Sequence, residues 1–142
     1  MELPDSFDTR RLADKHHAIA PDGSEVRVLC RVTAGSMAHF TLPPRAVSKA
    51  MAHRVVEEIW YFLSGHGRMW RRLGAHEAEV EVRAGSSITI PVGTHFQFRC
   101  DSDEPLRAVG VTMPPWPEDG DAYPVDGPWQ PSEDVTGSRD GS

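Results

Sequence analysis

The stretch from His53 to Gly65 reads HRVVEEIWYFLSG, and a second stretch from Gly85 to His95 reads GSSITIPVGTH. Both are rich in the β-branched and aromatic residues that favour strands, and glycines mark their boundaries. Each stretch also carries a histidine, and the first carries carboxylates as well. The two stretches therefore predict paired strand regions that bring polar side chains into an apolar setting.

The remainder of the chain shows the same kind of pattern. Short alternating runs are separated by glycine, proline or Asp/Ser clusters, and no window has a helical period. Pro21-Asp22-Gly23-Ser24 is a strong turn signal that makes residues 17–20 a hairpin partner of residues 25–32. Further strands are expected at residues 37–42, 51–55, 58–63, 68–72, 77–82, 87–91, 95–100 and 106–113. This regular spacing is typical of an antiparallel sandwich or barrel.

The spacings within the two opening stretches are more specific. They contain His53-x4-Glu58, Glu58-x6-Gly65 and Gly85-x5-Pro91-x-Gly93, in that order and about twenty residues apart. Together these frames resemble the paired motifs of the cupin superfamily. The resemblance implies an all-β fold, a single-domain cupin-type β-barrel (double-sheet jelly roll), with the site inside the barrel. Glu58 then faces inward.

The resemblance also implies a set of metal ligands, normally three histidines and one glutamate. His53 and Glu58 match this set, but Met51 and Phe96 stand where two of the histidines belong. His95 lies one residue early, and a one-residue shift sends a strand side chain to the opposite face. If a bulge near Gly93 turns His95 inward, then His53, Glu58 and His95 form a set for one divalent transition metal (Zn, Fe, Mn or Ni).

The alternative is a metal-free barrel. In this interpretation His53 and Glu58 form a hydrogen-bonded pair. A buried histidine and a buried carboxylate satisfy each other in this way without a metal ion. The pair is also a suitable general acid and base. The pocket around it is expected to be lined by Met51, Trp60, Phe62, Phe96 and Phe98. Such a lining favours an apolar or aromatic small-molecule ligand.

The two ends of the chain differ from the predicted barrel, which spans residues 25–113. Residues 1–24 form an N-terminal segment, and residues 114–142 form an acidic, proline-rich C-terminal arm whose end is expected to be disordered. The arm holds seven acids and one base, so it accounts for the whole net charge of −6. Because the rest of the chain is balanced, no basic face for nucleic acid is expected.

Other features of the sequence indicate the cellular compartment and the oligomeric state that we expect. No run approaches the ~20 apolar residues of a membrane span, and the first residues do not form a signal peptide. A cytoplasmic protein without membrane contact is therefore expected, with Cys30 and Cys100 as reduced thiols. The resemblance implies a homodimer, for which the strand at residues 68–72 and the aromatic groups of the arm are candidate contacts.

Three functions remain open at this point. The first is a small-molecule-binding cupin that uses His53 and Glu58 for proton transfer. The second is a metal-dependent oxygenase or isomerase with His53, Glu58 and His95 as ligands. The third is a ligand-sensing or accessory module without catalysis. The cupin fold hosts all three classes, so only the chemistry of the site can separate them.

Overall fold

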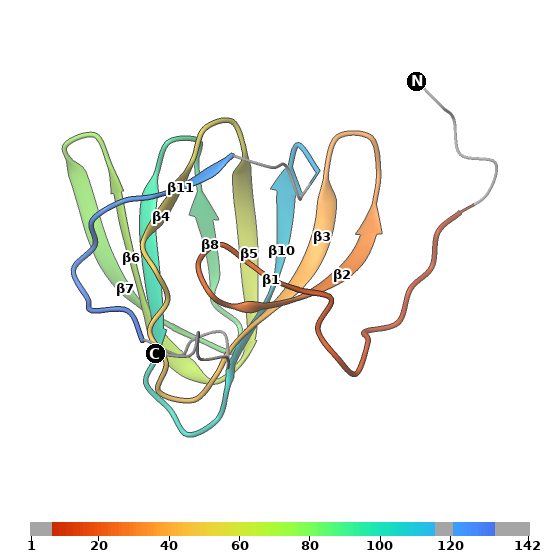
Figure 1. Ribbon diagram of the computed structural model, residues 1–142, viewed down its shortest axis with the longest axis horizontal. Coiled ribbons are helices and arrows are strands. Elements are labelled where there is room, and N and C mark those ends of the chain that lie inside the picture. The colour runs from red at the N-terminus through yellow and green to blue at the C-terminus, as the bar shows by residue number, and fades with distance from the viewer. Residues whose placement is uncertain (1–6, 116–120, 133–142) are drawn as a thin grey trace, which may run out of the picture.

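The computed structural model describes residues 7–115 and 121–132, and within these residues all regular structure is β. Eleven strands form two antiparallel sheets that face each other (Figure 1). No helix in this part of the chain is long and apolar enough to cross a bilayer. The strands are β1 (Ala18–Ile19), β2 (Glu25–Arg31), β3 (Ser36–Leu42), β4 (Met51–His53), β5 (Glu57–Ser64), β6 (His66–Leu73), β7 (His76–Arg83), β8 (Ser87–Ile90), β9 (His95–Cys100), β10 (Leu106–Met113) and β11 (Ala122–Pro124).

The larger sheet has the order β1-β2-β3-β10-β5-β8, and the smaller sheet has the order β11-β4-β9-β6-β7. Strands that are distant in sequence, such as β3 and β10, are therefore neighbours. Two facing antiparallel sheets connected in this way form the predicted double-sheet jelly roll. The hairpin expected at residues 17–20 is also present, since Ala18 pairs with Val26 across the turn at residues 21–24.

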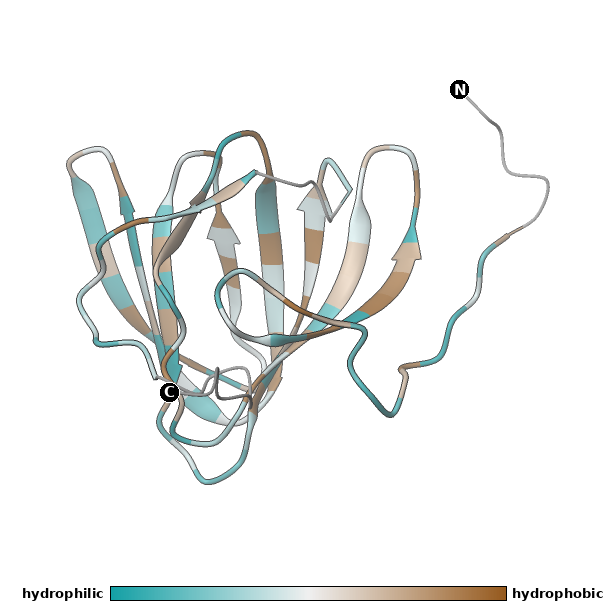
Figure 2. Cartoon of the chain, viewed as in Figure 1, coloured by the Kyte–Doolittle hydropathy of each residue, from teal (hydrophilic) through white to brown (hydrophobic). Residues whose placement is uncertain are grey.

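The alternation predicted for the first opening stretch is confirmed in β5. Glu58, Trp60 and Phe62 are buried between the sheets, whereas the residues between them are exposed. Figure 2 shows bands of contrasting hydropathy along the strands. In β5 burial does not follow hydropathy, since Glu58 is buried whereas Ile59 and Leu63 are exposed. Gly65 follows the strand with a φ of 81°, which favours glycine, and an added Cβ there would lie 2.5 Å from the carbonyl oxygen of Pro105.

Aromatic rings fill the space between the sheets. The ring of Trp60 stacks on Phe40 at a centroid distance of 4.9 Å and meets Phe98 edge-on at 5.1 Å. Gly110 makes room for this stack, because an added Cβ would lie 2.8 Å from the Phe40 ring and 2.9 Å from the Trp60 ring. A small barrel either fills its interior with side chains or keeps a ligand cavity, and here the filling is almost complete.

The sheets extend beyond residues 25–113 on both sides. Strand β1 lies in the predicted N-terminal segment, and β11 lies in the predicted arm and pairs with β4. Gln97, which is fully buried, donates from Nε2 to the carbonyl oxygens of Ser48 (2.8 Å) and Trp129 (2.9 Å). Its Oε1 accepts the backbone N–H of Trp129 at 3.1 Å. These bonds attach residues after β11 to the outer face of the smaller sheet.

Both cysteines are free thiols, as expected, with Cys100 buried and Cys30 half-buried. Trp116 and the last ten residues, which belong to the predicted arm, lie outside the described residues.

Candidate functional site

Strand β5 places two polar groups on the inner face of the larger sheet. Glu58 and Trp60 are two residues apart and share that face, so the indole lies beside the carboxylate. Trp60 donates its Nε1–H to Glu58 Oε1 at 2.7 Å. Glu58 is 5% exposed and Trp60 2% exposed, so this bond forms away from bulk water. The indole therefore fixes the orientation of the carboxylate.

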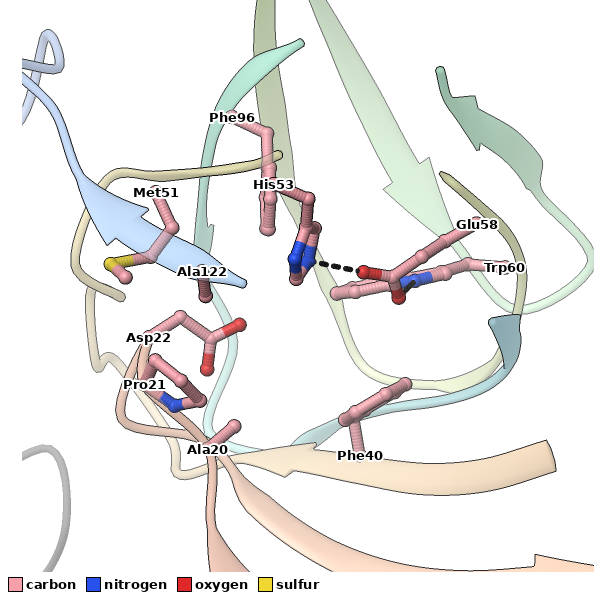
Figure 3. Close-up of a pocket in the computed structure, with 10 residues that line it drawn as sticks. All are labelled: Ala20, Pro21, Asp22, Phe40, Met51, His53, Glu58, Trp60, Phe96 and Ala122. Atoms are coloured by element: carbon pink, nitrogen blue, oxygen red, sulfur yellow. Dashed lines mark hydrogen bonds and ion pairs between the residues drawn. The ribbon is translucent and has the colours of Figure 1, made fainter. Parts of the chain in front are cut away.

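His53 ends β4 in the opposite sheet and meets Glu58 across the interior. Its Nε2 lies 2.7 Å from Glu58 Oε2 (Figure 3). Burial by itself lowers the pKa of His53, but hydrogen bonds to Glu58 and Asp121 and their charges raise it above its ordinary value overall. The structure therefore brings together the two residues that the sequence places at the centre of the site, with His53 favoured as an imidazolium.

Asp121 is a third member of this polar chain, and no motif of the sequence indicates its role. Its Oδ2 lies 2.9 Å from His53 Nδ1, and its two oxygens also accept the backbone N–H groups of Val55 (2.8 Å) and Val56 (3.3 Å). Asp121 lies just before β11, whose pairing with β4 sets Ala122 opposite His53. A single acid within an acidic, proline-rich segment carries no signal that would distinguish it from its neighbours.

Asp22 lines the same cavity as His53 and Glu58. It belongs to the turn between β1 and β2, where its Oδ1 accepts the backbone N–H (2.9 Å) and the hydroxyl (2.7 Å) of Ser24. Figure 3 shows its carboxylate directed into the cavity. Burial raises the pKa of Asp22, and the nearby charge of Glu58 raises it further, against the hydrogen bonds of Ser24. The turn motif predicted the loop geometry but not this second role.

The cavity between these groups is small. Its volume is about 20 Å³, room for on the order of one water molecule. Three of the predicted pocket residues, Met51, Trp60 and Phe96, line it, and Met51 and Phe96 are direct cross-strand partners. The other two, Phe62 and Phe98, are buried near Trp60 and do not line the cavity. The expected wide aromatic pocket is thus largely filled by the aromatic rings themselves.

His95 does not join His53 and Glu58. It precedes the buried Phe96 at the start of β9, and its Nδ1 lies 3.5 Å from Nη2 of Arg72 in the neighbouring strand β6. Gly93 has a positive φ of 82°, yet the turn around it leaves His95 on the outer face. The inward turn required for the three-residue metal set is therefore absent.

The donor set at the site does not fit the implied metal. Within residues 7–115 and 121–132, no three His, Cys, Asp or Glu side chains are arranged to hold a metal ion. Both ring nitrogens of His53 are engaged by carboxylates, and each Glu58 oxygen already has a hydrogen-bond partner. Met51 and Phe96 supply apolar atoms where further ligands would be needed.

Comparison with known proteins identifies the architecture. The sequence model of the cupin domain family matches residues 38–112, more than half of the chain. A comparison with curated proteins found no match. Among solved structures, a deletion mutant of the Bacillus subtilis oxalate decarboxylase superimposes with a TM-score of 0.68 at 19% identity. That match covers 88% of this chain and 35% of the other.

Two further oxalate decarboxylase structures match similarly. The Lactobacillus farciminis enzyme in its formate complex gives a TM-score of 0.62 at 19% identity, over 73% of this chain and 32% of the other. A Bacillus subtilis structure from a study of its Mn(II) centres gives 0.63 at 19% identity, over 75% and 29%. The chain thus spans about a third of the length of these solved relatives. At this identity the likeness concerns the fold alone.

Proposed function

The chain belongs to the cupin family, and on that premise we propose that it binds a small polar molecule against the His53–Glu58 pair and catalyses proton transfer. The observation that carries this proposal is the 2.7 Å contact between His53 Nε2 and Glu58 Oε2 in a buried cavity. A general acid and base at hydrogen-bond distance, shielded from water, accelerate proton transfer by about 10²–10⁴-fold. The reaction class is an isomerisation or tautomerisation that needs no oxidant.

Each polar residue has a distinct task in this proposal. Glu58 accepts a proton from the ligand on a carboxylate lone pair that its bonds to Trp60 and His53 leave free, and it returns a proton at another atom of the ligand. His53 holds the Nε2–H that donates to Glu58 Oε2 and exchanges its proton with the carboxylate through this contact. Asp121 accepts the Nδ1–H of His53 and so holds the ring with Nε2 toward the cavity. Trp60 fixes the Glu58 carboxylate by its indole N–H. His53 and Glu58 are the catalytic residues, whereas Asp121 and Trp60 are positioning residues.

The charges of the residues around the cavity favour a neutral or cationic ligand. Asp22 and Glu58 line the cavity, Asp121 lies behind His53, and no Lys or Arg of the described chain contributes to the lining. A dicarboxylate such as oxalate, named for the structural neighbours, would meet carboxylates without a guanidinium to bind it. An enclosed aromatic ring needs a cavity of about 150 Å³. The cavity of about 20 Å³ is too small to enclose any organic ligand, so the ligand of this proposal binds at the opening and places only its reacting group beside His53 and Glu58.

The second candidate function is metal-dependent catalysis. It is favoured by the Mn(II) centres of a structural neighbour, and it would use His53 and Glu58 as ligands with His95. The outward position of His95 and the apolar Met51 and Phe96 argue against it. Elemental analysis of protein expressed with added metal tests this candidate. Stoichiometric metal that is lost in both His53→Ala and His95→Ala would establish it.

The experiment for proton transfer is hydrogen exchange from D₂O into a panel of small neutral and cationic molecules with acidic C–H bonds, followed by NMR. We expect wild-type protein to exchange one member and Glu58→Gln to be slower by about 100-fold or more. The matched control is Glu57→Gln, because Glu57 is adjacent in sequence but exposed on the outer face. Equal exchange by Glu58→Gln would refute the proposal. Saturable binding without exchange would favour the non-catalytic module.

A further inference from the structure

Two buried polar atoms on the outside of the barrel lack a partner. Among the described residues, three buried side-chain polar atoms have no hydrogen bond, and two of these, His39 Nδ1 and Thr41 Oγ1, lie together on β3. The two residues are 4% and 7% exposed. Because they are two residues apart, they share the outward face of the larger sheet. Unsatisfied polar groups at neighbouring positions call for an explanation.

The sheet register surrounds these atoms with charged side chains. Arg27 of β2 is the cross-strand partner of His39. Thr41 lies between Glu25 of β2 and Arg107 of β10. Two adjacent cross-strand rows on the outward face therefore present two arginines, one glutamate, an imidazole and a hydroxyl. This face lies on the other side of β3 from the cavity at His53, since Phe40 points inward between His39 and Thr41.

The chain N-terminal to β1 encloses this region. Arg27 donates from Nε to the carbonyl oxygen of Ala13 and from Nη2 to that of Asp14, both at 2.9 Å. Figure 1 shows this segment beside β2, on the outside of the larger sheet. With Pro43, Pro44 and Pro105 it borders a groove of about 440 Å³ whose lining includes His39, Thr41 and Arg107. The groove has the size of a small-molecule site.

The groove lining carries charges of both signs, Asp14 and Glu25 against Arg27 and Arg107, and Arg107 is the arginine with the weakest bonds. Arg27 is occupied by the two carbonyl oxygens, and Glu25 lies 3.7 Å from both Arg27 Nη1 and His16 Nδ1, toward the β2 side. Arg107 contacts Ser64 Oγ at 3.5 Å, a weak interaction for a guanidinium. Burial lowers the pKa of His39, and the charges of Arg27 and Arg107 lower it further, against the smaller effect of its own backbone carbonyl, which raises it. A neutral His39 with a proton on Nδ1 is a donor, as is the hydroxyl of Thr41.

We propose that this outer groove is a second ligand site, in which the oxyanion of a small molecule is bound by Arg107, His39 Nδ1–H and the hydroxyl of Thr41. A guanidinium with two neutral donors matches the acceptor-only oxygens of a carboxylate or a phosphate. The site differs from the barrel cavity, whose lining includes no Lys or Arg of the described residues. It goes beyond the proposed function and does not depend on it.

The test follows the imidazole resonances of protein with ¹⁵N-labelled histidine at neutral pH. Sodium acetate and sodium phosphate are titrated separately, with sodium chloride as the ionic-strength reference. We expect the His39 Nδ1 resonance to shift saturably with at least one of the two anions, while the His53 resonance stays unchanged. The tighter of the two identifies the natural ligand group as a carboxylate or a phosphate. A shift with neither anion, or an equal shift with chloride, would overturn the proposal.

Three variants separate a defined site from general electrostatic attraction. Arg107→Gln should weaken binding by about tenfold or more, because it removes a charge-assisted hydrogen bond. Thr41→Val keeps the shape of the side chain and should weaken binding several-fold. Arg83→Gln is the matched control, since Arg83 is an exposed arginine of β7 in the other sheet. Unchanged binding in both Arg107→Gln and Thr41→Val, with thermal melts confirming folding, would also overturn the proposal.

Discussion

Replacing Asp121 with asparagine tests the polar chain through His53. The Asp121 carboxylate accepts three N–H groups: His53 Nδ1–H at 2.9 Å and the backbone N–H groups of Val55 at 2.8 Å and Val56 at 3.3 Å. An amide has one acceptor oxygen and one NH₂ group, so either orientation places an NH₂ against an N–H donor. Asp121→Asn therefore loses a hydrogen bond and leaves the His53 imidazolium with a single carboxylate partner.

The expected cost is about 3 kcal/mol, at the low end of the range of about 3–5 kcal/mol for removing one partner of a buried ion pair. An unfolding entropy of about 2.1 cal/mol/K per residue gives about 0.3 kcal/mol/K for this chain of 142 residues. The melting temperature should thus fall by about 10 °C. Asp126→Asn is the matched control, because Asp126 is exposed in the same segment. It should change stability by less than about 0.5 kcal/mol.

The pH dependence should change as well. A raised folded-state pKa means that His53 stabilises the fold fully below its unfolded pKa and loses this contribution as the pH rises through the folded value. Without the charge of Asp121 the pKa of His53 in the folded state falls. The stability that His53 contributes should therefore begin to be lost at a lower pH, and the total loss should be smaller. Thermal melts between about pH 6 and about pH 9 measure the loss, and NMR titration measures the pKa of His53. A melting temperature and His53 pKa equal to those of Asp126→Asn would refute this reasoning.

Three further variants address neighbouring features. Asp22→Asn should raise the free energy of unfolding at neutral pH but not at a pH below the ordinary carboxyl pKa. Burial raises the pKa of Asp22, so only the ionised form of its carboxyl is destabilising. Equal effects in thermal melts at both pH values would contradict this. Gly110→Ala should cost about 1–3 kcal/mol and shift the indole N–H resonance of Trp60, since the added Cβ lies 2.9 Å from that ring. Gln97→Leu removes the acceptor of the Trp129 backbone N–H and should therefore speed amide hydrogen exchange at Trp129. An unchanged exchange rate would show that the bond from Trp129 to residue 97 does not protect this amide.

The strands of the barrel were predictable because inward and outward residues alternate along each strand, a pattern that a short stretch of sequence already contains. In β5 the inward residues are buried and the outward ones exposed, as period-two reasoning requires. The same reasoning favoured an outward His95, and the structure has no bulge that reverses it. His53 and Glu58 were identified because their spacing to each other and to Gly65 resembles the first cupin motif, which implies an inward position for both. Their contact across the barrel then follows from the positions of β4 and β5 in opposite sheets.

Other parts of the site depend on contacts between distant segments, for which the sequence has no local pattern. Asp121 is separated from His53 by 68 residues, and its role arises from the pairing of β11 with β4. The carboxylate of Asp22 completes a turn and borders the cavity at the same time, and only the first function has a sequence signature. The aromatic residues were correctly expected to be buried, but sequence does not reveal how little space their rings leave.

The position of Asp121 also bears on how this protein is divided into modules. The cupin domain match ends at residue 112, whereas the counter-ion of His53 comes nine residues later. A truncated barrel would keep both strands that carry His53 and Glu58, yet it would leave the imidazolium with half of its compensating charge. Grafting this domain by its family boundaries would therefore transfer His53 and Glu58 without Asp121, the second carboxylate partner of His53. The unit that must be inherited, cloned or redesigned intact is the barrel together with the residues that follow it.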